Sequence, residues 1–198
     1  TEGGKEITSK TEYMGAQMHI QGNDEFNWQT TTLYDGATQI RGRGNYTWVQ
    51  PKKPYRLKLE SKTSVFGMSL SKHFVMLADY GVRNLLHNIV GQDFADRNTD
   101  NYTCKFTSVV LVMNGGYQGV YQFGEQVRID EGRVDIFDWE QQASDIAKTI
   151  GKAEGFSPED ITTLETVMTM NMAWITDKKV AFHGVTYDFA NYGISYPD

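Results

Sequence analysis

Residues 41–59 read RGRGNYTWVQPKKPYRLKL, and this stretch decides the local fold of the chain. Its second half alternates, so that the tyrosine and two leucines of residues 55–59 share one face of an extended strand while Arg56 and Lys58 share the other. Its first half holds two glycines, which favour a tight turn because they adopt positive φ without steric cost. The stretch therefore predicts a strand, a glycine turn and a second strand with cations on its outward face.

This pattern is also typical of a site for an anion. Glycines let backbone N–H groups approach an anion closely, and Asn45 and Thr47 add short polar side chains beside them. A following strand with outward lysines can hold the phosphates of a nucleotide without a helix terminus. No Gly-Lys-Ser or Gly-Lys-Thr follows the turn, so the pattern is not a P-loop. The alternative interpretation is a tight β-turn with a solvated basic face.

Charge is distributed unevenly around this stretch. Residues 41–62 carry seven basic residues against Glu60 alone, whereas residues 131–198 carry twelve acidic residues against five basic ones. The formal net charge of the whole chain is −6. A basic hairpin within an acidic chain predicts either a local anion site or pairing with the acidic remainder.

Outward from this stretch, the first part of the chain reads mostly as strands and the last part as helices. Alternation predicts strands over 16–20, 37–43, 55–59, 74–77, 105–113 and 118–123, and Asn114-Gly115-Gly116 predicts a hairpin turn. Apolar residues at three- and four-residue spacing predict helices over 82–97 and 138–152, and a third helix opens at Ser157-Pro158 and reaches about residue 175. The tail, 185–198, shows no clear period. The expected class is α+β, with an antiparallel β-rich lobe, one embedded helix and a helical extension.

Several classes of protein are disfavoured by composition. The single cysteine, Cys104, cannot form an internal disulfide, and the four scattered histidines predict no metal site. The acidic balance disfavours nucleic acid as a partner, and no apolar run is long enough to span a membrane.

The order of the motifs resembles that of the CotH kinase family, a group of atypical protein kinases named for a spore-coat protein. Family members share an RGRGN-S/T-W segment, a PKK-P-Y-x-x-K-L segment, a Phe-Gly-Met turn, an HWVLLA-like strand and an NGEYxGxYxxxE segment. The corresponding segments here are 41–48, 51–59, 66–68, 73–78 and 112–125, and the resemblance covers about residues 12–136.

The resemblance implies that residues 12–136 form the smaller, sheet-rich lobe of a kinase-like fold, which covers ATP. Residues 137–198 would then be a helical extension towards a catalytic carboxy-terminal lobe that this chain does not include. The nucleotide-binding residues implied in this way are Arg43, Asn45, Thr47, Lys53, Lys58 and Glu125. Lys53 or Lys58 would pair with phosphate, and Glu125 would lie near the base or ribose; the alternative for Glu125 is a salt-bridged carboxylate at a strand end.

Two departures from the family pattern concern activity. Where family members read D-x-S/T-L-L-R-N, this chain has Val82 in place of the aspartate and His87 in place of the arginine. The family's later HNYYxY-like and WDxD-like segments, which hold Mg²⁺, do not occur here, and 187–193 is interpreted as a linker. We therefore expect little turnover from this chain, and no catalytic or metal-binding residue is assigned.

Two functions remain open from sequence. The first is the ATP-binding lobe of a bacterial protein kinase, with ATP and Mg²⁺ as implied cofactors and a protein hydroxyl as acceptor. The second is a non-catalytic, extracellular or cell-surface module that binds carbohydrate or protein. Its planar side chains would come from Trp28, Trp48, Tyr46, Tyr80, Tyr102 and Tyr117.

Overall fold

The computed structural model describes residues 1–23, 30–81, 84–174 and 179–188. These form two compact units, residues 1–135 (unit 1) and 136–198 (unit 2). Unit 1 contains β1 (Met14–Asn23), β2 (Thr30–Gly42), β3 (Tyr55–Thr63), β4 (Ser71–Leu77), α1 (His87–Asn98), β5 (Phe106–Met113) and β6 (Gly116–Glu125), with short 3-10 helices at Glu2–Gly4 and Tyr46–Val49. Unit 2 contains α2 (Trp139–Glu154), α3 (Pro158–Trp174), β7 (Lys179–Phe182) and β8 (Val185–Asp188).

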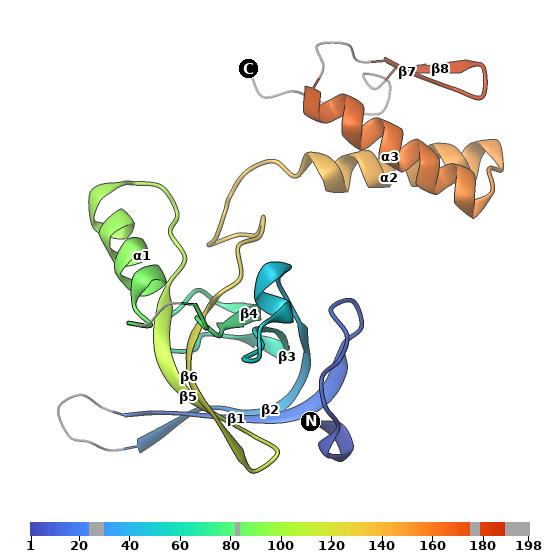
Figure 1. The fold of residues 1–198 in the computed structure, drawn as a ribbon. Coiled ribbons are helices and arrows are strands. Elements are labelled where there is room, and N and C mark those ends of the chain that lie inside the picture. Colours follow the sequence, from blue (N-terminus) through green and yellow to red (C-terminus); the bar gives the residue numbers. More distant parts are fainter. Residues whose placement is uncertain (24–29, 82–83, 175–178, 189–198) are drawn as a thin grey trace. The chain divides into compact units, whose positions relative to one another are not determined.

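Unit 1 is built on one curled antiparallel sheet with the strand order β1-β2-β3-β4-β6-β5 (Figure 1). Each neighbouring pair of strands is antiparallel, as the predicted hairpins require. The turn between β5 and β6 has positive φ at Asn114 (51°) and Gly115 (78°), which explains the Asn-Gly signal. The predicted α+β class is confirmed.

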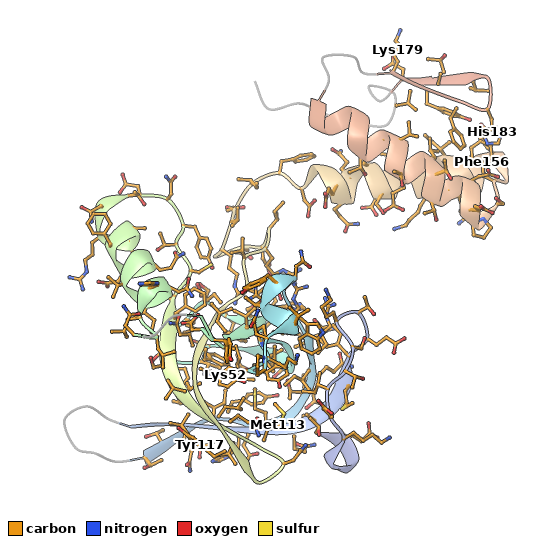
Figure 2. The ribbon with its side chains drawn as sticks, viewed as in Figure 1. Lys52, Met113, Tyr117, Phe156, Lys179 and His183 are labelled. Atoms are coloured by element: carbon orange, nitrogen blue, oxygen red, sulfur yellow. The ribbon has the colours of Figure 1, made fainter. Side chains whose placement is uncertain are left out.

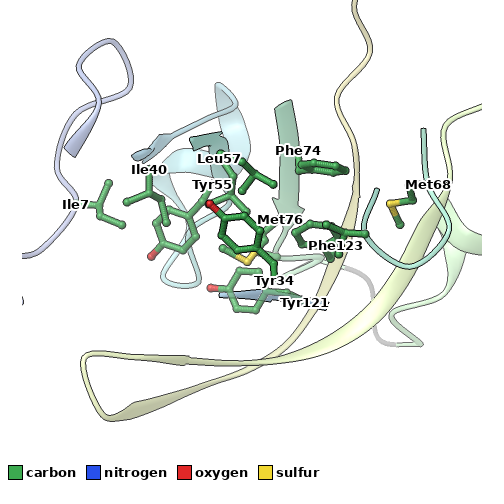
Figure 3. Close-up of a cluster of buried hydrophobic side chains, with 13 residues drawn as sticks. Ile7, Tyr34, Ile40, Tyr55, Leu57, Met68, Phe74, Met76, Tyr121 and Phe123 are labelled. Atoms are coloured by element: carbon green, nitrogen blue, oxygen red, sulfur yellow. The ribbon is translucent and has the colours of Figure 1, made fainter. Parts of the chain in front are cut away.

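The core of unit 1 lies on one face of this sheet. Tyr55, Leu57 and Leu59 of β3 are buried there beside Phe74 and Met76 of β4 (Figure 3). Phe74 and Phe123 stack with ring centroids 5.1 Å apart. Each fully buried side chain of this size stabilises the fold by roughly 1.5–3 kcal/mol, so the alternation seen in 55–59 fixes which face of β3 is inside.

Unit 2 is a pair of helices with a small hairpin. Asp138 caps α2, since its carboxylate accepts a hydrogen bond from the backbone N–H of Gln141 at 2.9 Å. Ser157 accepts one from the N–H of Asp160 at 3.1 Å, as its place before Pro158 predicted. The helices pack through a buried cluster that β7 and β8 complete: Ala143, Ile146, Ala147, Ile150, Leu164, Met168, Val180 and Tyr187.

Two expectations differ from the structure. Helix α1 begins at His87 rather than near residue 82, because Leu85 takes a positive φ of 55° just before it. No side chain of α1 is buried among the described residues, and Val90 and Phe94 of the predicted apolar stripe are 59% and 68% exposed. The tail forms the β7–β8 hairpin up to residue 188, with a His183-Gly184 turn, and residues 189–193 of the expected linker lie outside the described residues.

No helix in the described part of the chain is long and apolar enough to cross a bilayer.

Candidate functional site: a cationic pocket beside the glycine turn

The glycine turn after β2 is held by close packing that requires its two glycines. A Cβ on Gly42 would overlap the ring of Trp48, and one on Gly44 would overlap the hydroxyl of Thr47. Gly44 also has a φ of +83°, which side-chain-bearing residues rarely adopt. The N–H of Arg43 donates to the carbonyl of Pro54 at 3.2 Å, which brings the turn back onto the start of β3. The motif therefore fixes where Arg43 lies relative to β3.

We expect Gly42→Ala to destabilise the chain by about 1–3 kcal/mol, because the added methyl group displaces the Trp48 ring. Gly91→Ala in α1 is the matched control. No atom lies within 4 Å of a Cβ built there, so alanine should stabilise that helix by about 0.5–1 kcal/mol. Chemical denaturation of both variants measures the two changes. A Gly42→Ala chain as stable as the wild type would contradict the close packing.

A pocket of about 780 Å³ opens beside this turn. It is bounded by the turn, by the outward face of β3 and β4, by the end of β6 and by the segment that leads into α1. The lining residues are Arg43, Tyr46, Thr47, Gln50, Lys52, Pro54, Arg56, Val75, Leu77, Ala78, Asp79, Tyr80, Gly81, Asn88, Phe106, Glu125, Gln126 and Val127.

Three cationic side chains line the pocket, those of Arg43, Lys52 and Arg56. The Nε atoms of Arg43 and Arg56 are buried and have no hydrogen-bond partner among the described residues. None of the three side chains joins an ion pair within the described part of the chain. Burial lowers the pKa of Arg43, and the neighbouring charge of Arg56 lowers it further. The guanidinium groups of Arg43 and Arg56 thus lie close enough for their charges to repel, and neither forms an ion pair with an acid of the described residues.

Lys52, which also lines the pocket, is held in place by its own contacts. Figure 2 labels this side chain in unit 1. Its Nζ donates to the carbonyl of Val120 and lies 4.5 Å from the centroid of the Tyr121 ring. Burial lowers the pKa of Lys52, while the nearby carboxylate of Asp79 acts in the opposite direction. Lys52 is therefore a preorganised positive charge.

Asp79 links the pocket to the start of α1. Its carboxylate accepts hydrogen bonds from the amides of Asn88, at 3.1 Å, and of Gln122. The Gln122 amide also donates to the carbonyl of Leu85 at 2.6 Å. Burial raises the pKa of Asp79, and Lys52 opposes that shift. Asp79 has a positive φ of 45°, a strained conformation that this network compensates.

The pocket also has apolar lining. The ring of Phe106 lies over Gly124, where any Cβ would overlap it, and Val75 and Leu77 of β4 line the pocket as well. Val75 is the cross-strand neighbour of Arg56. Tyr46 and Tyr80 also line the pocket and are 77% and 54% exposed, so each offers an open ring face. The pocket thus combines a cationic part with an apolar and aromatic part.

Three of the residues expected to bind nucleotide line this pocket, namely Arg43, Thr47 and Glu125. The other three do not line it. Asn45 precedes the short helix at Tyr46–Val49, and Lys58 is exposed farther along β3. The Nζ of Lys53 donates to the carbonyl of Trp48 at 2.7 Å and lies 5.4 Å from the centroid of its ring.

Glu125 is almost fully buried, with 1% of its surface exposed. Its carboxylate accepts hydrogen bonds from the N–H of Ser69 at 2.7 Å, the hydroxyl of Tyr102 at 2.8 Å and the N–H of Lys105 at 3.2 Å. Burial alone would raise the pKa of Glu125, but these hydrogen bonds outweigh it and lower the pKa below its ordinary value. Both carboxylate oxygens are thereby engaged by the protein itself.

The position that departs from the family arginine, His87, is exposed at the first residue of α1 and does not line the pocket. Val82 lies outside the described residues. Of the aromatic residues considered for a binding surface, Tyr117 is 69% exposed on the β5–β6 hairpin, while Tyr102 is held by Glu125. Trp28 also lies outside the described residues.

The two implied cofactors differ in how well they fit. The guanidinium groups of Arg43 and Arg56, whose buried Nε atoms have no hydrogen-bond partner among the described residues, fit the phosphate groups of ATP. For Mg²⁺, the described residues contain no group of three or more His, Cys, Asp or Glu side chains that could hold a metal ion. The carboxylates of Asp79 and Glu125 are engaged by protein donors, so these residues do not fit a magnesium site.

The fold and the pocket define a small α+β lobe whose pocket is lined by cationic, apolar and aromatic side chains. The sequence profile of the family described as CotH kinase protein matches residues 40–161, which is more than half of the chain. The chain therefore belongs to the CotH kinase family. A search of curated protein sequences gave no match.

Proposed function

We propose that unit 1 binds ATP in the pocket beside the glycine turn, as the nucleotide-covering lobe of a protein kinase. The reaction of such a kinase transfers the γ-phosphoryl group of ATP to the hydroxyl of a protein serine or threonine. One observation carries the proposal: Arg43, Lys52 and Arg56 converge on one pocket, and none of them pairs with an acid of the described chain.

The cationic and the apolar residues of the lining suit the two ends of a nucleotide. Guanidinium groups bind phosphate oxygens through paired N–H donors, and a lysine adds a compact point charge. The wall of Val75, Leu77 and Phe106 and the ring faces of Tyr46 and Tyr80 suit a purine base. In this arrangement the residues of the chain bind and orient the nucleotide and neutralise its phosphates.

Isothermal titration with Mg-ATP tests the proposal. We expect Lys52→Ala to weaken binding by roughly tenfold, the equivalent of about 1.4 kcal/mol, because it removes a dehydrated charge from the pocket. The control is Lys62→Ala, an exposed lysine on β3 that does not line the pocket.

Titration of Lys53→Ala and Lys58→Ala decides which lysine contacts phosphate. No heat of binding with the wild-type chain, or equal affinity for Lys52→Ala and the wild type, would contradict the proposal. Binding of a neutral oligosaccharide in place of ATP would favour the carbohydrate-binding alternative.

A further inference from the structure

The sheet of unit 1 has two free edges that border one cavity. In the strand order β1-β2-β3-β4-β6-β5, β1 and β5 are the outermost strands, and no pairing joins them among the described residues. The sheet curls (Figure 1), and a cavity of about 1090 Å³ is lined by residues from both of these strands. None of its lining residues also lines the pocket beside the glycine turn.

The lining shows that the edges of β1 and β5, and not only their inner faces, border the cavity. Side chains of a strand alternate between two faces, so one face contributes only every second residue. Here the consecutive residues 16–22 of β1 and the consecutive residues 107–113 of β5 all line the cavity. The cavity therefore lies between the two edges, and it is here called the edge gap.

Alternate residues of β5 direct their backbone groups towards the edge gap. The N–H of Glu125 donates to the carbonyl of Lys105 at 3.1 Å, and the register continues from this pair without a shift along most of β5. In an antiparallel pair, directly opposite residues exchange both hydrogen bonds at every second position. The N–H and C=O groups of Ser108 and Val110 therefore point away from β6, and they form no hydrogen bond among the described residues.

Neither edge carries the residues that usually keep edge strands from pairing. Natural edge strands are protected by charged side chains, above all lysine, and by proline. β1 and β5 contain no proline, lysine, arginine, aspartate or glutamate. Residues 109–113 are all apolar, as in a strand buried on both faces, yet Val110 and Val112 are 64% and 59% exposed. β5 thus has the composition of a covered strand and the position of an edge strand.

We propose that an extended strand of a partner polypeptide adds to β5 in the edge gap, with its other edge facing β1. Hydrogen bonds to the β5 backbone give the affinity, and alternate side chains give the selectivity. The inward side chains of the partner are apolar, because Met18 and Ile20 of β1 and Leu111 of β5 lie partly buried against the core. The regular part of β5, residues 106–111, accepts a segment about 20 Å long.

A polypeptide strand fits the edge gap better than an acyl chain or a second copy of unit 1. An acyl chain would cover the outward N–H and C=O groups of β5 without bonding to them, and burial of an unpaired polar group is unfavourable. The free edges of the six-stranded sheet in a second copy are again β1 and β5, which are each held in their own sheet and cannot enter the gap of another copy. The proposal does not depend on nucleotide binding.

Fluorescence anisotropy of a labelled peptide tests the proposal on the full chain. The peptide alternates valine and serine over about eight residues and carries a pair of lysines at each end for solubility. Two control peptides carry N-methyl groups on the valine amides or on the serine amides. Because alternate amides point to opposite edges of a strand, we expect the parent peptide to bind and at least one methylated peptide to bind roughly tenfold more weakly.

Ser108→Pro tests the same edge on the protein. It removes the outward N–H and places a ring in the path of the added strand, at an edge position where a strand tolerates proline. The affinity should fall by roughly tenfold or more. Ser108→Ala, which removes the hydroxyl group but keeps the N–H, should stay within about twofold of wild type. Thermal unfolding verifies the fold of the proline variant, and the methylated peptides test the edge on the wild-type chain in any case.

No binding of the parent peptide, equal binding of all three peptides, or equal affinities of folded Ser108→Pro and Ser108→Ala would overturn the proposal. Tighter binding of a fatty acid than of the peptide would overturn the class of occupant. A dimer in sedimentation that Ser108→Pro abolishes would assign the edge to a second copy instead. Titration of Mg-ATP against the same wild-type chain shows separately whether the nucleotide proposal fails.

Discussion

The double variant Arg43→Gln, Arg56→Gln should bind Mg-ATP at least tenfold more weakly than the wild-type chain, and it should unfold at the same temperature or a higher one. Both expectations come from one feature. The two guanidinium groups lie together in the pocket with buried Nε atoms that lack partners among the described residues. Removing them relieves repulsion in the free chain, but it removes charge-assisted hydrogen bonds worth about 1.5–3 kcal/mol each from the complex.

The double variant should lose affinity for Mg-ATP without losing stability, and this combination makes the experiment decisive. Most substitutions of half-buried residues lower stability and affinity together, so a stable variant with weak binding identifies residues kept for a ligand. The control is Lys5→Gln, Lys62→Gln, which removes the same charge from two exposed positions outside the pocket. Calorimetric titration gives the affinities, and thermal unfolding without ligand gives the stabilities. Unchanged affinity would contradict the ligand role, and a markedly lower unfolding temperature would contradict the repulsion.

The sequence predicted the sheet well because its signals are local. Alternation in 55–59 identified the buried face of β3, and Asn114-Gly115 identified the β5–β6 turn. The helix signal before α1 was less informative. Its apolar spacing is present, yet Val90 and Phe94 are exposed, since a period shows which residues share a face but not what covers that face.

The pocket was predictable in part. If the alternation of β3 is extended back before Tyr55, Lys52 falls on the same face as Arg56 and Lys53 falls on the opposite face. In the structure, Lys52 and Arg56 both line the pocket, and Lys53 does not. This alternation is present in the sequence, but it is a weaker signal than the family's PKK motif. The motif itself does not distinguish the two adjacent lysines. Asp79 could not have been predicted, because its partner Gln122 is 43 residues away and pairing across that distance depends on strand order.

The role of Glu125 also depends on contacts between residues that are far apart in the sequence. Substitution of Glu125 is expected to cause the largest loss of stability. Its three donors come from Ser69, Tyr102 and Lys105, and the first of these is 56 residues away. From the sequence, Glu125 could either form a salt bridge at the end of a strand or contact the nucleotide. In the structure the carboxylate accepts hydrogen bonds that join the end of β6 to the turn before β4 and to the segment before β5.

We expect Glu125→Ala to destabilise unit 1 by about 3–4 kcal/mol, because it leaves three donors without an acceptor and each unsatisfied buried group costs about 1–3 kcal/mol. Glu125→Gln keeps the shape and one acceptor, so its stability should fall between those of wild type and Glu125→Ala. The control is Glu60→Ala, which removes an exposed carboxylate of β3. Denaturant unfolding of the four chains gives the order.

The pH dependence of stability shows whether the ionised carboxylate of Glu125 or only the packing of its side chain stabilises unit 1. The pKa of folded Glu125 lies below its ordinary value, so its contribution to stability is fully present above the pKa of the unfolded chain, about 4.3, and is lost as the pH falls through the folded pKa. The difference in stability between wild type and Glu125→Ala should therefore shrink on acidification below about pH 4. A difference that stays constant down to the acid transition would show that packing, and not the ionised carboxylate, stabilises this junction. A Glu125→Ala chain as stable as wild type would instead leave Glu125 free to act as a ligand-binding carboxylate.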